Sequence, residues 1–147
     1  MTSSATNAWS RHFFAFVSFT VPMLLIGFGY KYGVFRDEYA ALGLYRDDIL
    51  MSFAFGSLVI QGAFWAYIYN HLFVSEKFTS GALKLFLLAF PVGLSFNVFV
   101  IGAKHVMSSV SQFAILESGF TLIAYAVICP LIALSYSVTR KTRSTIS

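Results

Sequence analysis

The sequence predicts an all-α, polytopic membrane protein, an antiparallel bundle of four transmembrane helices that forms one domain over residues 1–147. Hydrophobic residues make up 58% of the chain and charged residues only 11%, whereas a soluble domain carries roughly 25% charged residues. The 17 phenylalanines cannot all be hidden in one small core in water. In addition, four separate stretches are almost free of charge, and each is long enough to cross a bilayer.

Each of these four stretches is expected to form a helix, because about 20 residues at 1.5 Å each cross about 30 Å of hydrocarbon. None shows the two-residue alternation of a barrel strand. The spans are expected at about residues 12–34, 49–74, 83–105 and 112–137. A basic residue precedes the first span, as in a signal peptide. No small-residue cleavage pattern follows it, however, and we interpret it as an uncleaved helix.

The segments between the spans are short, except for the first loop. Two tight polar connections, 75–80 and 106–111, predict that the helices on either side are antiparallel neighbours. In the first loop, Tyr39, Leu42 and Tyr45 recur every three residues between charged ends, which predicts a short amphipathic helix at the membrane interface. The polar ends, residues 1–10 and 139–147, are expected to be mobile tails.

The distribution of basic residues predicts the orientation. With four crossings, the two tails and the second loop share one side and carry six Lys and Arg residues, against four on the other side. Lys and Arg are enriched in cytoplasmic loops, so both termini are predicted to be cytoplasmic. The basic segment Arg140–Arg143 is explained by anionic lipid headgroups, and nucleic acid is not an expected partner.

Close contacts between the helices are expected at small residues, because lipid tails are as apolar as leucine and cannot drive helices together. Three pairs have the four-residue spacing that permits close approach, namely Gly29 and Gly33, Gly62 and Ala66, and Ala89 and Gly93. We expect these pairs to pack within the bundle, and homodimer contacts are the alternative.

Polar residues near the spans are the candidate binding residues, because such groups are costly in hydrocarbon. The connection from Lys104 to Glu117 is short enough for the two charges to meet. We therefore expect an outward-facing cluster roofed by the first loop. Its members are Asn97, Lys104, His105 and Glu117, with Arg36 and Arg46 above them and Gln61 near the middle of the second span. In the alternative, Lys104 and His105 simply lie at the interface and Glu117 caps the start of the fourth helix.

Two histidines allow a haem hypothesis. His12 and His71 lie near the same ends of spans one and two, where two axial ligands are geometrically possible. Boundary histidines are more often interfacial, so no cofactor and no metal site is predicted. No catalytic motif is present in the sequence, and the single cysteine, Cys129, excludes an internal disulfide framework.

Three segments carry a resemblance to a known kind of protein: residues 38–46 (Glu-Tyr-Ala-Ala-Leu-Gly-Leu-Tyr-Arg), Gln61-Gly62 and residues 67–69 (Tyr-Ile-Tyr). With these, the chain resembles small, uncharacterised bacterial four-helix membrane proteins of the domain-of-unknown-function type. The resemblance implies a location in the bacterial inner membrane. It brings no activity and no site residues.

The leading functional hypothesis is a small non-enzymatic integral membrane protein, an accessory subunit or lipid-interacting partner of a larger membrane assembly. Its expected partners are membrane lipids, other membrane subunits or copies of itself. One alternative is a homo-oligomeric transporter or channel that uses Glu117, Asn97 and Lys104. A second alternative is a haem-binding or redox protein that uses His12 and His71.

Overall fold

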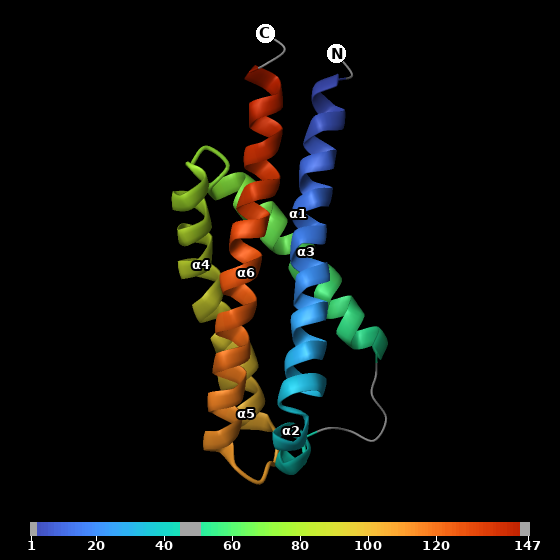
Figure 1. Cartoon of the computed structure of the whole chain (residues 1–147), viewed down its shortest axis with the longest axis vertical. Coiled ribbons are helices and arrows are strands. Elements are labelled where there is room, and N and C mark those ends of the chain that lie inside the picture. Colours follow the sequence, from blue (N-terminus) through green and yellow to red (C-terminus); the bar gives the residue numbers. More distant parts are fainter. Residues whose placement is uncertain (1–2, 45–50, 145–147) are drawn as a thin grey trace.

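The computed structural model describes the backbone of residues 3–44 and 51–144, and the side chains of residues 9–44 and 52–137. Within these ranges every regular element is a helix, which confirms the predicted all-α class (Figure 1). The elements are α1 (Ser3–Phe28), the π-helix η1 (Gly29–Val34), α2 (Arg36–Leu42), α3 (Met51–Leu72), α4 (Phe78–Leu94), the π-helix η2 (Ser95–Val100), α5 (Ile101–Lys104) and α6 (Val110–Ser144).

The centre of the fold is α6, which packs against α1 on one side and α4 on the other. Figure 1 shows α1 and α6 running in opposite directions along the length of the molecule, with the start of α1 and the end of α6 at the same end. The short helix α2 lies at the opposite end. Helix α3 packs mainly on α1 and crosses the molecule obliquely, so that its first half slants away from the other helices (Figure 1).

Three stretches of the described chain are long and apolar enough to cross a membrane. They are Trp9–Val34, Phe78–Lys104 and Val110–Ser137. These match the first, third and fourth predicted spans and support an integral membrane protein. Helix α3 occupies the second predicted span and has 22 residues, and the side chain of its first residue lies outside the described ranges. A membrane crossing by α3, and with it the four-span topology and the cytoplasmic termini, remains a prediction.

Several helix ends differ from those predicted. Helix α1 begins at Ser3 and α6 continues to Ser144, so helical backbone enters both segments that we expected to be mobile tails. The physical reason is that an existing helix extends far more easily than a new one nucleates. Helix α2 confirms a helix in the first loop, but it ends at Leu42, and Tyr45 of the predicted pattern lies outside the described residues. The helix is capped by Gly43, whose φ of 69° is a conformation that glycine adopts without strain.

Small residues permit two close helix contacts inside the bundle. A Cβ atom built on Gly62 would lie 2.7 Å from Oγ1 of Thr20, because α3 crosses α1 at this point. A Cβ atom on Gly93 would overlap the ring of Tyr125, because α4 presses against α6 there. Packing within the chain, as predicted, therefore accounts for both glycines.

The remaining predicted pair of small residues, Gly29 and Gly33, makes no such contact. Gly29 and Gly33 are exposed, and a Cβ atom on either would meet no protein atom within 4 Å. They lie in the π-helix η1, where they make no close helix contact in the described chain. The prediction of packing within the bundle is therefore wrong for this pair.

Candidate functional site

The most highly connected polar group in the described chain is a set of side chains that we call the Glu117 cluster. Its members are Lys31, Tyr39, Asn97, Glu117 and Thr121. Glu117 lies on α6 and is only 3% exposed. Its Oε1 atom accepts hydrogen bonds from Nζ of Lys31 at 2.5 Å and from the hydroxyl of Tyr39 at 3.0 Å.

The π-helix η1 places Lys31 in this cluster. Phe35 N–H donates to the carbonyl of Tyr30 at 2.9 Å, which closes the wide turn of the π-helix. The Tyr30 hydroxyl donates to the carbonyl of Leu116 at 3.1 Å and so fixes η1 against α6. As a result, two consecutive residues, Tyr30 and Lys31, both reach the helix that carries Glu117.

Aromatic rings surround the Lys31 ammonium group. Its Nζ atom lies 4.6 Å from the centre of the Phe120 ring and 5.3 Å from that of Tyr39, within the range of cation–π attraction. The side chain of Lys31 is 25% exposed, whereas that of Glu117 is 4% exposed. The carboxylate therefore depends on its partners for stabilisation much more than the ammonium does.

The cluster continues toward the centre of the bundle through two neutral side chains. The Thr121 hydroxyl donates to the backbone carbonyl of Glu117 at 2.7 Å, one turn earlier on α6. Nδ2 of Asn97, in the π-helix η2, donates to Oγ1 of Thr121 at 3.2 Å. The Glu117 cluster thus joins η1, α2, η2 and α6.

Helix α2 is held against the Glu117 cluster by hydrogen bonds at its C-terminal end. The amide and the hydroxyl of Ser108 donate to the carbonyls of Leu42 at 3.1 Å and Ala41 at 2.8 Å, groups that have no partner within a helix that ends here. A hydrophobic core between α2 and α6 is formed by Tyr39 and Leu42 of α2 with Phe113 and Leu116 of α6. Within the described residues, every buried side-chain nitrogen or oxygen has a hydrogen-bond partner. The arrangement therefore fits a structural role, in which these contacts join η1, α2, η2 and α6 at one end of the bundle; we call this set of contacts the polar latch.

The cluster differs in membership from the one expected from the sequence. Asn97 and Glu117 belong to it and are linked through Thr121. Lys104 is exposed at the end of α5 and takes no part in the Glu117 ion pair, because the π-turn of η1 brings Lys31 to that carboxylate instead. His105 is exposed, and its Nδ1 lies 3.2 Å from the carbonyl of Ile101.

The remaining predicted binding residues lie apart from the cluster or outside the described residues. Arg36 is exposed at the start of α2, and Arg46 lies outside the described ranges. Gln61 is on α3, where its Nε2 donates to Oγ of Ser57 at 2.9 Å. The ligand-binding role proposed for these residues remains a prediction.

The two histidines of the haem hypothesis have different surroundings. Nδ1 of His12 lies 3.0 Å from the hydroxyl of Tyr136, whereas His71 is exposed and its ring lies over that of Tyr67 with the ring centres 3.9 Å apart. No group of three or more His, Cys, Asp or Glu side chains suited to a metal occurs in the part of the chain that the structure describes. The haem hypothesis remains a prediction.

Sequence reasoning missed three residues of these polar contacts: Lys31, Tyr39 and Tyr136. Lys31 was counted only for topology, and Tyr39 only for the apolar face of a short helix. A signal was present for Lys31. Lys31 lies at the end of the first predicted span and Glu117 near the start of the fourth, and these two span ends are predicted to lie on the same side of the membrane. No comparable signal identifies Tyr136, whose partners are 124 and 70 residues away in sequence.

Comparison of the chain with protein-family models, with curated proteins and with solved structures finds no match. The resemblance to small bacterial four-helix membrane proteins therefore remains a prediction. The fold itself defines the class of the protein, which is all-helical, with three described helices able to cross a membrane and a satisfied polar latch at one end of the bundle.

Proposed function

We propose that the protein is a non-enzymatic subunit of a membrane assembly and that the first half of α3 contacts another membrane helix. One observation carries this proposal. On the half of α3 that slants away from the bundle, a hydrogen-bonded pair of polar side chains lies beside an uncovered glycine (Figure 1).

The first half of α3 makes few contacts with the rest of the chain. From Ser52 to Ser57 every residue is exposed, and farther along the helix Ile60 is 71% exposed. The second half, by contrast, buries Trp65, Ala66 and Tyr69 in the core. Because an apolar helix surface is compatible with lipid, this exposure alone does not require a partner.

Polar and small residues on the exposed half supply the additional argument. The Gln61 amide and the Ser57 hydroxyl satisfy each other only in part, because an amide group can form four hydrogen bonds. Beside them, a Cβ atom on Gly56 would have no atom of the described residues within 4 Å. Small residues that permit close approach, next to side chains able to bond across helices, are typical of contact surfaces between membrane helices.

The Glu117 cluster supports a structural role for the opposite end of the molecule. Its charges and hydroxyl groups are paired with one another, so the described contacts already explain why these costly residues are present. Transport through Glu117, Asn97 and Lys104, and haem binding by His12 and His71, remain alternative predictions.

The proposal is tested by native mass spectrometry of the protein released directly from membranes. The wild-type chain is expected to carry the mass of at least one further protein subunit. Gly56→Leu is expected to release that subunit, because the added side chain occupies the space in which another backbone would approach. Folding should be unaffected, since a Cβ atom at this position meets no atom of the described chain within 4 Å.

Ala126→Leu is the matched control, because Ala126 is an exposed small residue on α6 and not on α3. This variant is expected to keep the subunit. A wild-type chain that is found alone would overturn the proposal, as would a Gly56→Leu variant that retains its partner. Equal loss in both variants would show that the contact is not made by α3 and would also overturn it.

A further inference from the structure

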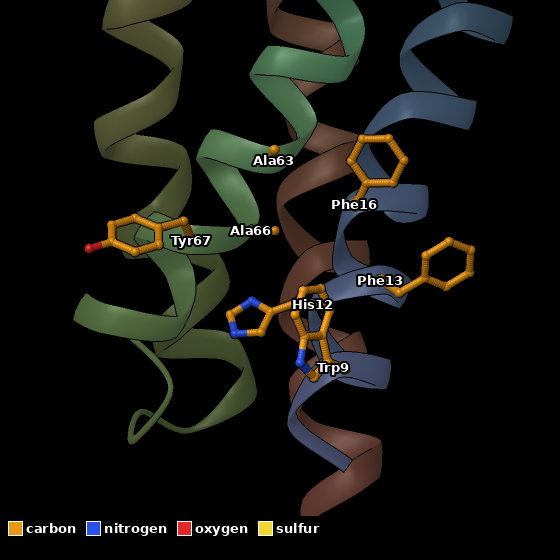
Figure 2. A pocket seen from close by; sticks show the side chains of 7 residues that line it. All are labelled: Trp9, His12, Phe13, Phe16, Ala63, Ala66 and Tyr67. Atoms are coloured by element: carbon orange, nitrogen blue, oxygen red, sulfur yellow. The ribbon is translucent and has the colours of Figure 1, made fainter. Parts of the chain in front are cut away.

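A groove lies at the end of the bundle opposite the Glu117 cluster, between α1 and the second half of α3. The groove has a cavity volume of about 600 Å³, which is within the range of about 300–1,000 Å³ typical of small-molecule sites. Figure 2 shows Trp9 and His12 at one end of this groove, Phe16 farther along α1, and Ala63 and Ala66 on the facing side of α3.

The hydrogen bonds of Tyr136 determine which nitrogen of His12 carries a proton. The Tyr136 hydroxyl lies 2.8 Å from the carbonyl oxygen of Ala66, which can only accept, so its single proton is donated there. The hydroxyl oxygen of Tyr136 also lies 3.0 Å from Nδ1 of His12, so it accepts a hydrogen bond from the proton that this nitrogen carries. In the neutral ring Nε2 is then unprotonated and is a hydrogen-bond acceptor.

This acceptor is available to a ligand. None of the described residues forms a hydrogen bond with Nε2 of His12. His12 is the fourth residue of the first membrane-spanning stretch, whereas Phe16 is one turn farther into it. The groove therefore combines one acceptor near the membrane surface with an apolar wall that runs deeper.

The walls of the groove favour an aromatic ligand. Trp9 and Phe13 are 79% and 61% exposed, so their rings are reachable from the surrounding lipid. Aromatic rings bind other rings through offset or edge contacts that add to the gain from burying apolar area. On the facing helix α3, the small side chain of Ala63 leaves the space beside Phe16 open.

We propose that this groove binds a lipid-soluble phenol, whose hydroxyl donates to Nε2 of His12 while its apolar tail lies along Phe16 and Ala63. A phospholipid phosphate does not complement this site, because phosphodiester oxygens only accept hydrogen bonds and the available atom of the neutral imidazole is itself an acceptor. The site is separate from the exposed half of α3, so it goes beyond the proposed function.

The test uses a decylphenol brominated on its ring, because bromine quenches tryptophan fluorescence on contact. The wild-type protein in nanodiscs is titrated with this phenol and, separately, with its methyl ether, which partitions into the membrane but has no proton to donate. Saturable quenching of Trp9 is expected with the phenol, with affinity about threefold to tenfold higher than for the ether. A Trp9→Phe variant supplies the background quenching of Trp65.

Two substitutions locate the site. His12→Ala should bind the phenol and the ether equally, because the acceptor is gone. Ala63→Leu should abolish saturable quenching by filling the groove, and it should leave the fold intact because Ala63 is exposed. The matched control, Ala126→Leu, should bind as the wild type does.

Three results would overturn the proposal: equal affinity of the wild type for the phenol and its ether, unchanged binding by Ala63→Leu, or equal loss of binding by the control. Displacement of the probe by an anionic phospholipid but not by unbrominated decylphenol would also overturn it, in favour of a headgroup site. Because Ala63→Leu and the ether leave His12 intact, the test remains decisive even if His12→Ala does not fold.

Discussion

The ion pair between Lys31 and Glu117 gives the sharpest prediction about stability. Removal of one partner of a buried pair costs about 3–5 kcal/mol, because the other charge is left without compensation. Lys31→Met leaves a carboxylate whose side chain is only 4% exposed, so its cost is expected near the upper end, about 5 kcal/mol. Glu117→Gln leaves an ammonium that is 25% exposed and can turn toward water, so about 3 kcal/mol is expected.

The double variant Lys31→Met/Glu117→Gln distinguishes the coupling between the two charges from the cost of leaving either charge unpaired. It contains no stranded charge, and the new amide oxygen can still accept from the Tyr39 hydroxyl, which lies 3.0 Å from Oε1. A loss of about 1–2 kcal/mol is expected, because one amide N–H is left poorly paired, and this loss is smaller than that of either single variant.

The measurement is the free energy of unfolding in micelles, followed by helical circular dichroism during titration with a denaturing detergent. Lys104→Met is the control, because Lys104 is exposed and a change within about 0.5 kcal/mol is expected. If the double variant lost as much stability as the two single variants together, the charges would not be coupled and the latch interpretation would be refuted.

Three further predictions concern other parts of the molecule. Gly93→Ala should lower stability by about 1–3 kcal/mol through overpacking, whereas Gly29→Ala, with open space at its Cβ, should not lower it; comparative unfolding of the two variants checks this. A hydrogen bond from Lys84 holds the pKa of Glu76 below its ordinary value, so stability from this contact is present at neutral pH and is lost as the pH falls through that lowered pKa. The stability difference between wild type and Glu76→Gln should therefore vanish in acid, and it should be small throughout because both groups are exposed to solvent. Cys129 is 1% exposed, so a maleimide should label it only after unfolding, as mass spectrometry would show.

The helices of this protein could be predicted from sequence because their signal is local. A run of about 20 apolar residues is sufficient evidence for a membrane-spanning helix, and three such stretches are present in the described chain. The amphipathic helix α2 was predictable for the same reason, since Tyr39 and Leu42 recur at helical spacing and are both buried. The π-helices were not predictable, because no residue pattern in 29–34 or 95–100 distinguishes a π-turn from an α-turn.

The candidate site was only partly predictable, because its contacts are long-range. Asn97 and Glu117 were identified as costly polar residues, and they do belong to one network. The partner of Glu117 was not identified, since the choice between Lys31 and Lys104 depends on the width of the turn at η1. Sequence position suggested the nearer lysine, and the structure uses the one 86 residues away.

The two ends of the bundle differ in how their polar groups are used, and this difference predicts where substitutions act. At the end capped by α2, Glu117 and its neighbours pair with one another. Substitutions there should therefore change the stability of the protein without changing ligand binding. At the end where α1 begins, the hydrogen bonds of Tyr136 leave Nε2 of His12 without a partner among the described residues, beside an open groove. Substitutions in that groove should change binding with little effect on stability. If Ala63→Leu destabilised the chain as much as Glu117→Gln does, this division between a structural end and a binding end would be wrong.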